Sequence, residues 1–294
     1  MKTSIQLRRA IMERRAVVVP GCHDALSAMV VESAGFEAIQ VSGFGIAGSL
    51  LGKPDVGLVQ MKDVLDVTWN VVQAVGIPVM ADVDTGGGNA INAAAITERL
   101  IAMGAAGMNV EDQVFPKRCG HTPGRRVVAI EDMVRKIKVA AASRSSRDFL
   151  IVARTDARTQ HGLDEALRRG ELYLEAGADG LFIEAPESPE ELAKVGRTFQ
   201  GVPQIANIVE GGGQTPVLPP EELYRLGFKM ITYPCTVLFK VARTIETALA
   251  DLKAGRPAAS ADMVDFAAFK DIVGYQDWAT IDDTYRPAPQ AKPS

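Results

Sequence analysis

The decapeptide at 176–185, AGADGLFIEA, contains the unit from which the fold is built. Gly177 can end a helix, and a short gap separates it from the apolar run 181–183. The preceding stretch, 163–175 (LDEALRRGELYLE), has the apolar spacing of an amphipathic helix. Helix, glycine, turn and buried strand therefore follow one another, and the strand ends in the charged residue Glu184.

The same plan recurs at 34–43 (AGFEAIQVSG), 103–112 (MGAAGMNVED) and 226–234 (LGFKMITYP). Other apolar runs fill the intervals. The eight predicted strands start near Val17, Ala38, Pro78, Met108, Phe149, Leu181, Gln204 and Met230. Near-continuous apolar strands that alternate with helices are typical of parallel strands buried on both faces. Eight such units predict an α/β fold of the (β/α)8 TIM-barrel type, with a doubly wound open sheet as the alternative.

We expect the 294 residues to form a single α/β-barrel domain. The barrel is predicted at about 15–250, and a C-terminal helical tail at about 255–294. The tail combines aromatic clusters with helical spacing before a Pro-rich end. We therefore expect its helices to dock on the barrel or on a neighbouring subunit.

The composition is that of an ordinary globular protein, with 47% hydrophobic and 23% charged residues. A net charge of −4 argues against nucleic acid as a partner. No apolar stretch approaches the roughly 18 residues of a membrane span, so we expect no membrane association. Cys22, Cys119 and Cys235 form neither a disulfide framework nor a metal motif, and a cytoplasmic location is the simplest expectation.

Polar residues collect where the predicted strands end. In a barrel of this type, active sites lie at the carboxyl ends of the strands. These residues are Ser42, Gly43, Asp82, Asp84, Glu111, Asp112, Arg154, Asp156, Glu184, Asn207 and Glu210. Charged residues without a role at a site would instead be scattered over the exposed faces of the helices.

Asp82 and Asp84 point to the same side of their strand, because strand side chains alternate. Two converging carboxylates repel unless a cation joins them, and Glu111 is the expected third member. Hard oxygen ligands favour Mg²⁺, or Mn²⁺, over zinc. The alternative is ordinary turn chemistry. The nearby TGGG at 85–88 and EGGG at 210–213 lack the lysine and spacing of phosphate-binding loops, so we interpret both as flexible segments.

The segment 115–124, FPKRCGHTPG, places Cys119 among Lys117, Arg118 and His121. Cationic neighbours lower the pKa of a thiol, so we expect a reactive cysteine on a loop. Arg154 emerges from a buried strand and needs an anionic partner, which is either a substrate or a structural carboxylate.

Five motifs together resemble the isocitrate lyase/phosphoenolpyruvate mutase superfamily, over about residues 5–250. They are DVDTGGGNA (82–90), EDQVFPKRCGH (111–121), VARTDA (152–157), FIEAPES (182–188) and ANIVEGG (206–212). The KRCGH string at 117–121 is similar to that of the carbon–carbon lyase branch. Within that branch, DTGGGNA at 84–90 most resembles the enzymes that cleave 2,3-dimethylmalate and a related plant petal protein.

The resemblance implies a barrel whose terminal helix is exchanged between subunits of a homotetramer. It also implies that Asp84 binds Mg²⁺ directly, with Asp82 and Glu111 in the outer shell. The residues implied to bind a small dicarboxylate or oxo acid are Ser42, Gly43, Phe44, Asp55, Arg118, Gly120, Asn207 and Glu210. The residues implied to take part in catalysis are Cys119, Arg154, Glu184, His121 and Lys117, and Cys119 lies on a mobile gate loop.

The implied activity is Mg²⁺-dependent cleavage of an alkyl-substituted malate, such as 2,3-dimethylmalate, to a 2-oxo acid such as pyruvate and a carboxylic acid. Cys119 would protonate the departing carbon. Family members that cleave 2-methylisocitrate carry an arginine near the position of Phe239, although a one-residue shift would bring Lys240 there. The alternatives are 2-methylisocitrate cleavage, oxaloacetate decarboxylation or hydrolysis, a phosphonate mutase or hydrolase, and a non-enzymatic sensor of small acids.

Overall fold

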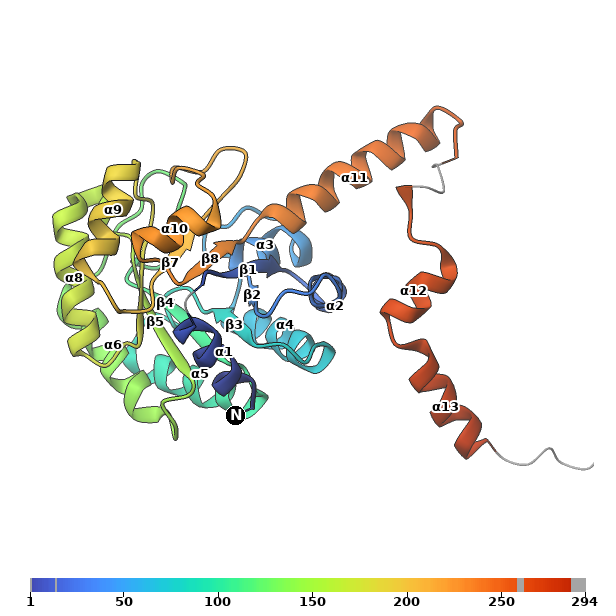
Figure 1. Cartoon of the computed structure of the whole chain (residues 1–294), viewed down its shortest axis with the longest axis horizontal. Coiled ribbons are helices and arrows are strands. Elements are labelled where there is room, and N and C mark those ends of the chain that lie inside the picture. Colours follow the sequence, from blue (N-terminus) through green and yellow to red (C-terminus); the bar gives the residue numbers. More distant parts are fainter. Residues whose placement is uncertain (1, 14, 258–261, 287–294) are drawn as a thin grey trace, which may run out of the picture. The chain divides into compact units, whose positions relative to one another are not determined.

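The computed structural model describes residues 2–13, 15–257 and 262–286, and Figure 1 labels its helices and strands. The strands are β1 (Val17–Cys22), β2 (Ile39–Val41), β3 (Val79–Asp82), β4 (Gly107–Glu111), β5 (Leu150–Thr155), β6 (Gly180–Ile183), β7 (Ile205–Asn207) and β8 (Met230–Tyr233). The helices are α1 (Lys2–Met12), α2 (Ala25–Ser33), α3 (Gly43–Leu50), α4 (Met61–Ala74), α5 (Ala90–Met103), α6 (Ile130–Ser143), α7 (Ala157–His161), α8 (Leu163–Glu175), α9 (Pro189–Thr198), α10 (Pro220–Leu226), α11 (Thr236–Lys253), α12 (Phe266–Ile272) and α13 (Tyr275–Tyr285).

The strands form one parallel sheet in the order β6-β5-β4-β3-β2-β1-β8-β7. A parallel bridge between Leu181 and Gln204 joins the two ends of this order, so the sheet curls into a nearly closed barrel. The barrel prediction is confirmed, and the open-sheet alternative is wrong. Each strand begins at, or within one residue of, its predicted start.

Glycines end the helices that lead into several strands. Gly104 after α5 (φ 91°) and Gly227 after α10 (φ 116°) have the left-handed conformation that glycine adopts without steric cost. Gly177, in the motif that opened the sequence analysis, has φ 110° one residue past the C-cap of α8. The helix–glycine–strand repeat therefore reflects a real local geometry.

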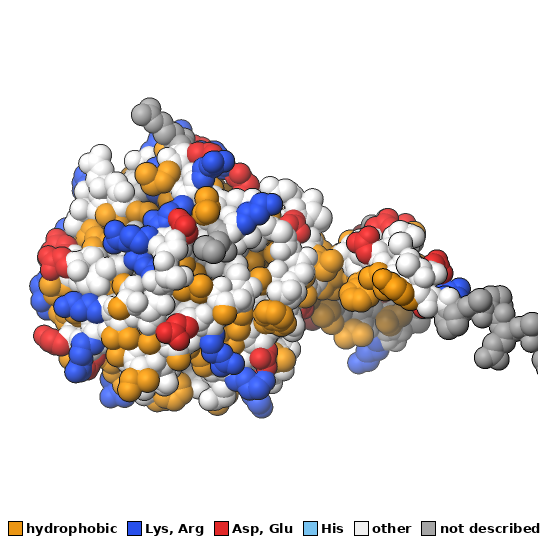
Figure 2. Space-filling model, turned by 90° about the horizontal axis from the view of Figure 1, so that it is seen from below, with side chains coloured by type: hydrophobic (Ala, Val, Ile, Leu, Met, Phe, Trp, Pro, Cys, Tyr) orange, Lys and Arg blue, Asp and Glu red, His pale blue; other side chains and the backbone are white. Residues whose placement is uncertain are grey.

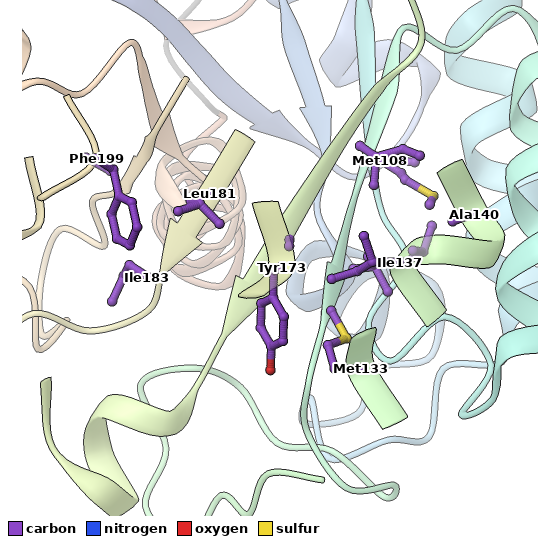
Figure 3. Close-up of a cluster of buried hydrophobic side chains, with 14 of the residues drawn as sticks. Met108, Met133, Ile137, Ala140, Tyr173, Leu181, Ile183 and Phe199 are labelled. Carbon is purple, nitrogen blue, oxygen red and sulfur yellow. The ribbon is translucent and has the colours of Figure 1, made fainter. Parts of the chain in front are cut away.

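Apolar side chains fill the space between the strands and the outer helices. Met108 of β4 lies beside Ile137 and Ala140 of α6 (Figure 3). A second cluster fills the amino end of the barrel, which we call the barrel floor. It combines inward-facing strand residues such as Leu150 with Leu7 and other apolar residues of α1.

The chain divides into two compact units, 1–240 and 241–294, and α11 spans the boundary. Within the second unit, α12 packs against α13. None of the described residues of α11, α12 or α13 is buried, and Figure 2 shows hydrophobic side chains exposed on this unit. The single domain and the exchange of helices between subunits remain predictions.

Over the described part of the chain, no helix combines the length and apolar character needed to cross a membrane.

Candidate active site

A small pocket lies among the carboxyl ends of the barrel strands and leaves about 40 Å³ of free space. We call it the site pocket. Its lining comes from Gln40, Ser42, Phe44, Asp55, Asp82, Lys117, Cys119, Gly120, His121, Arg154, Phe182, Glu184, Asn207, Val209, Pro234 and Cys235. Residues far apart in the sequence meet here because parallel strands all end on one side of a barrel.

The loop 115–125, which we call the gate loop, is closed over the site pocket. The backbone N–H of Cys119 donates to the Asp55 carbonyl at 3.1 Å. A Cβ atom on Gly120 would lie 2.5 Å from both Arg154 Nη2 and Glu184 Oε2. Only a glycine lets the loop approach these side chains so closely.

Lys117 carries the charge of the gate loop into the site. Its Nζ lies 2.7 Å from Asp55 Oδ1 and 2.6 Å from Asp84 Oδ1. Burial alone would lower the pKa of Lys117, but Asp84 and Asp55 raise it well above its usual value. Burial raises the pKa of Asp84 to about 6, and Asp82 adds to this while Lys117 opposes it.

Asp82 and Asp84 converge beside Gly43. A Cβ atom on Gly43 would lie 3.2 Å from Asp84 Oδ1 and 3.5 Å from Asp82 Oδ2. Glu111 is buried, and neither of its carboxylate oxygens has a hydrogen-bond partner among the described residues. In the parts of the chain described here, no three His, Cys, Asp or Glu side chains form a ready metal-binding group. Magnesium often takes only one or two protein carboxylates, so this oxygen-rich donor set still fits that ion.

Arg154 is the centre of a buried ion network. Its guanidinium donates to Asp156 at 2.8 and 3.0 Å, and lies 3.1 Å from Glu184 and 3.4 Å from Glu111. It also lies over the Phe182 ring, 4.9 Å from the centroid. Arg154 therefore has structural carboxylates as partners and also lines the pocket. The sequence had left open whether its anionic partner is a structural carboxylate or a substrate.

Asp156 and Asp112 are network residues whose roles the sequence analysis missed. Asp156 clamps Arg154 and also accepts from Arg125 at 3.2 Å. Asp112 accepts from the Asp156 backbone N–H at 2.9 Å and from Tyr173 OH at 2.8 Å, so it supports the network from behind. The available signal was proximity to Arg154 at the end of a strand, since Asp156 lies just beyond β5 as the N-cap of α7.

The expected low pKa of Cys119 is wrong, since burial raises the pKa of this thiol above its usual value. The three expected cations do not act on it as the sequence suggested. Lys117 is bound to two carboxylates, Arg118 is exposed, and burial lowers the pKa of His121 so that it favours the neutral form. The thiol is therefore protonated at neutral pH, which suits a proton donor better than a nucleophile.

His121 is held from two sides. Its Nδ1 accepts from the backbone N–H of Gln214 at 3.0 Å. Its Nε2 lies 3.5 Å from Glu184 Oε1 and 3.4 Å from Asn207 Nδ2. These contacts bring three of the sequence-predicted residues together at one edge of the site pocket.

The amino end of α3 borders the same pocket. Ser42 caps this helix by accepting from Gly45 N–H at 3.2 Å, and Phe44 lines the pocket. The first turn of a helix has N–H groups without intrahelical partners, and these favour anions. The expected carboxylate-binding segment 42–44 therefore lies beside the pocket.

Three predicted substrate-binding residues are absent from the pocket lining, namely Gly43, Arg118 and Glu210, although Gly43 lies between two lining residues, Ser42 and Phe44. Arg118 is exposed and donates to the Pro123 carbonyl at 3.0 Å, while its own backbone is held by the Gln113 side chain at 2.8 and 3.0 Å. Glu210 is exposed and accepts from the Thr236 hydroxyl. Both side chains bond to neighbouring segments in this closed arrangement.

The fold is a nearly closed (β/α)8 barrel, and a cysteine-bearing loop covers buried ion pairs at the carboxyl ends of its strands. This combination is typical of enzymes built on this barrel, whose active sites lie at that end. The chain matches the family model described as phosphoenolpyruvate phosphomutase over residues 7–253. It belongs to the phosphoenolpyruvate mutase/isocitrate lyase superfamily and is an enzyme of that superfamily.

Three relatives illustrate the range within the family. A 2,3-dimethylmalate lyase of Eubacterium barkeri is 42% identical over 287 residues, covering 97% of this chain and 99% of that protein. A petal death protein of Dianthus caryophyllus is 40% identical over 95% of this chain and 88% of its own length. A 2-methylisocitrate lyase of Aeropyrum pernix is 38% identical over 96% of this chain and 90% of its own length.

Solved structures agree in fold over nearly the whole chain. A 2,3-dimethylmalate lyase aligns with a TM-score of 0.91 and 32% identity, covering 100% of this chain and 99% of that one. An oxaloacetate acetylhydrolase bound to 3,3-difluorooxalacetate also aligns at 0.91, with 30% identity and 98% coverage of each chain. A phosphonopyruvate hydrolase complex with oxalate and Mg²⁺ aligns at 0.85, with 28% identity, covering 98% of this chain and 100% of that one. The predicted family is confirmed.

Proposed function

We propose that this enzyme is a Mg²⁺-dependent carbon–carbon lyase that cleaves an alkyl-substituted malate to a 2-oxo acid and a carboxylic acid. The observation that carries the proposal is the position of Cys119, a protonated thiol that shares one enclosed pocket with Arg154 and Asp82. A thiol there can give its proton to a carbanion from which water is excluded.

The reaction begins with substrate held by its carboxylate at the first turn of α3 and by Arg154 at its 2-oxygen. Magnesium held at Asp84, with Asp82 and Glu111 behind it, would supply further positive charge to the same oxygen. Glu184 accepts the hydroxyl proton, the C2–C3 bond breaks, and its electron pair stays on C3. The Cys119 S–H bond then breaks, and its proton goes to C3.

The pocket lining supports alkyl substituents on the substrate. Phe44, Val209, Pro234 and Cys235 contribute apolar surface to this lining. Its two fixed cations, Lys117 and Arg154, already pair with carboxylates of the chain. A dicarboxylate with alkyl groups therefore suits this lining better than a third carboxylate, whose buried charge would need its own partner.

The Phe239 position supports the same conclusion. Phe239 and Lys240 are both exposed and both outside the pocket lining. The Phe239 ring, however, meets the ring of the lining residue Phe44 edge to face, with centroids 5.9 Å apart. These contacts favour Phe239, rather than Lys240, as the residue nearer the pocket.

The substrate class is tested by measuring 2-oxo acid release from 2,3-dimethylmalate, 2-methylisocitrate, isocitrate and oxaloacetate, each with Mg²⁺ and with a chelator. We expect fastest release from 2,3-dimethylmalate, and none with the chelator. Faster turnover of 2-methylisocitrate or oxaloacetate would replace the proposed substrate. Binding of an acid without turnover would instead indicate a sensor.

Cys119→Ser tests the proton donor. A serine hydroxyl is a much weaker acid than a thiol, and loss of a general acid lowers kcat by about 10²–10⁴-fold. Cys22→Ala is the matched control, because Cys22 is a buried core residue outside the pocket lining. Unchanged kcat in Cys119→Ser would exclude the assigned role.

We also propose that the second unit serves assembly into a homotetramer. Its exposed side chains include Phe266 (77%), Trp278 (72%) and Tyr285 (80%), and apolar groups exposed in this way mark interaction surfaces. Analytical ultracentrifugation of the full chain and of Trp278→Glu tests this. We expect a tetramer that the variant weakens, whereas a monomeric full chain would contradict the proposal. We likewise propose a cytoplasmic location.

A further inference from the structure

The loop 209–215 (VEGGGQT), which follows β7, contains the glycine run that the sequence analysis interpreted as a flexible segment. Gly211 (φ 81°) and Gly212 (φ 136°) have left-handed backbone conformations. The Gly213 N–H donates to the Val209 carbonyl at 3.1 Å, so the loop turns back on itself. This turn presents Gln214 to the gate loop.

Gln214 makes two hydrogen bonds to the gate loop. Its backbone N–H donates to His121 Nδ1 at 3.0 Å, and its side-chain Oε1 accepts from Arg125 Nη2 at 3.3 Å. Arg125 in turn donates to Asp156, the carboxylate that clamps Arg154. One residue therefore touches the middle and the end of the gate loop.

The backbone bond determines where the His121 ring carries its proton. A backbone N–H is only a donor, so a ring nitrogen that accepts from it carries no proton. A neutral His121 must then carry its proton on Nε2, which lies 3.5 Å from Glu184 Oε1 and 3.4 Å from Asn207 Nδ2. The Asn207 amide does not need this nitrogen as an acceptor, because it donates to Glu184 Oε2 at 3.3 Å. The ring consequently presents a donor to the carboxylate assigned as the base.

We propose that Gln214 is a positioning residue whose main-chain N–H fixes His121 as the Nε2–H tautomer and so orients Glu184 for the reaction. The inference rests on the proposed function only for the role of Glu184. The tautomer itself follows from the contacts within the chain.

Protonation of His121 would break this arrangement. A doubly protonated ring has no acceptor for the Gln214 N–H, so the bond between the two loops is lost. The charged groups that act on His121 are Glu184, Arg154, Arg125 and Asp156. Glu184 and Asp156 favour the protonated ring, while the two arginines and burial disfavour it.

The test compares Gln214→Pro, which removes the N–H, with Gln214→Ala, which keeps it and loses only the bond to Arg125. ¹⁵N NMR of histidine-labelled enzyme reports the tautomer, and His121→Gln assigns the signal among the three histidines. We expect an acceptor-type Nδ1 in the parent and in Gln214→Ala, and mixed tautomers in Gln214→Pro.

The pH profile gives the second readout. Loss of a hydrogen bond to the neutral ring raises its pKa, so the acid limb of kcat/KM in Gln214→Pro moves up by about 0.7 pH unit, which is about 1 kcal/mol per hydrogen bond converted at about 1.36 kcal/mol per pKa unit. A parent enzyme with its proton on Nδ1 overturns the proposal, whether or not Gln214→Pro folds. The NMR result is independent of substrate, so it stands apart from any failure of the proposed activity.

Discussion

The two ends of the barrel are built from the same eight strands but hold opposite kinds of side chain. At the floor, Leu150 of β5 packs with Leu7 and other apolar residues, away from water. At the mouth, Arg154 of the same strand pairs with Asp156 and Glu184. Phe182 belongs to the floor cluster and also lines the site pocket, so it marks the boundary between them.

The floor mainly stabilises the folded barrel, whereas the mouth carries the groups that can take part in a reaction. Burial of apolar area stabilises the floor without any special geometry. The mouth instead buries charges whose desolvation opposes folding unless each has a partner. Burial raises the pKa of Glu111, Asp84 and Cys119 there, which is typical of functional sites.

Arg154→Met should have the largest effect, because it removes the shared cation of the buried ion network at the mouth. It leaves the carboxylates of Asp156, Glu184 and Glu111 without their shared cation, and breaking a buried ion pair costs about 3–5 kcal/mol. We expect this loss in denaturant unfolding, together with at least a 10²-fold fall in kcat/KM. Unchanged stability would show that the carboxylates do not depend on the guanidinium.

Leu150→Ala makes the matched change at the floor, on the same strand. Leu150 is 1% exposed, and truncating a buried leucine costs about 2–5 kcal/mol. We expect lower stability by denaturant unfolding, but kcat within about twofold of the parent enzyme at a temperature where the variant is folded. A large fall in kcat would mean that the two ends are energetically coupled.

The pH dependence of kcat/KM should reflect the shifted groups at the mouth. Burial raises the pKa of Cys119 above 9.0, so its thiol keeps its proton and the basic limb should lie above pH 9. Burial lowers the pKa of His121 below 6.5, so the neutral ring persists and the acid limb should lie below pH 6.5. Steady-state rates across pH 5–10 test both limbs, and Cys119→Ser should lose only the basic one.

Lys240→Ala should have the smallest effect. Lys240 is exposed and lies outside the site-pocket lining, although a one-residue shift in the resemblance would place it at the tricarboxylate position. We expect KM for the best substrate to change by less than about twofold. A rise in KM of tenfold or more would show that Lys240 contributes to substrate binding. It would then favour a tricarboxylate such as 2-methylisocitrate as the substrate.

The strands were predictable because their signals are local. Four of the apolar runs, such as 181–183, follow a glycine at the end of a helix, and both features depend on neighbours in the sequence. The strand-end rule then placed Ser42, Asp82, Arg154 and Glu184 at one pocket, where the structure finds them. The family resemblance added the gate loop around Cys119.

The electrostatics of the site were less predictable. Lys117 pairs with Asp55, 62 residues earlier in the chain, and nothing in the local sequence links them. Burial raises the pKa of Cys119, and Lys117 does not oppose this because it is paired with Asp55, so the expected low pKa of the thiol was wrong. Asp112 was grouped with the site, yet it faces the supporting network through Tyr173.

The sequence by itself determined the barrel, the end of the barrel that carries the chemistry and most of the residues that line the pocket. Periodicity and glycine placement act over a few residues, so one chain is enough to reveal them. Only the tertiary structure decided how each charge is shared, which thiol keeps its proton and which nitrogen of His121 accepts. These properties depend on burial and on partners brought together from distant strands, because charges interact through space and not along the chain.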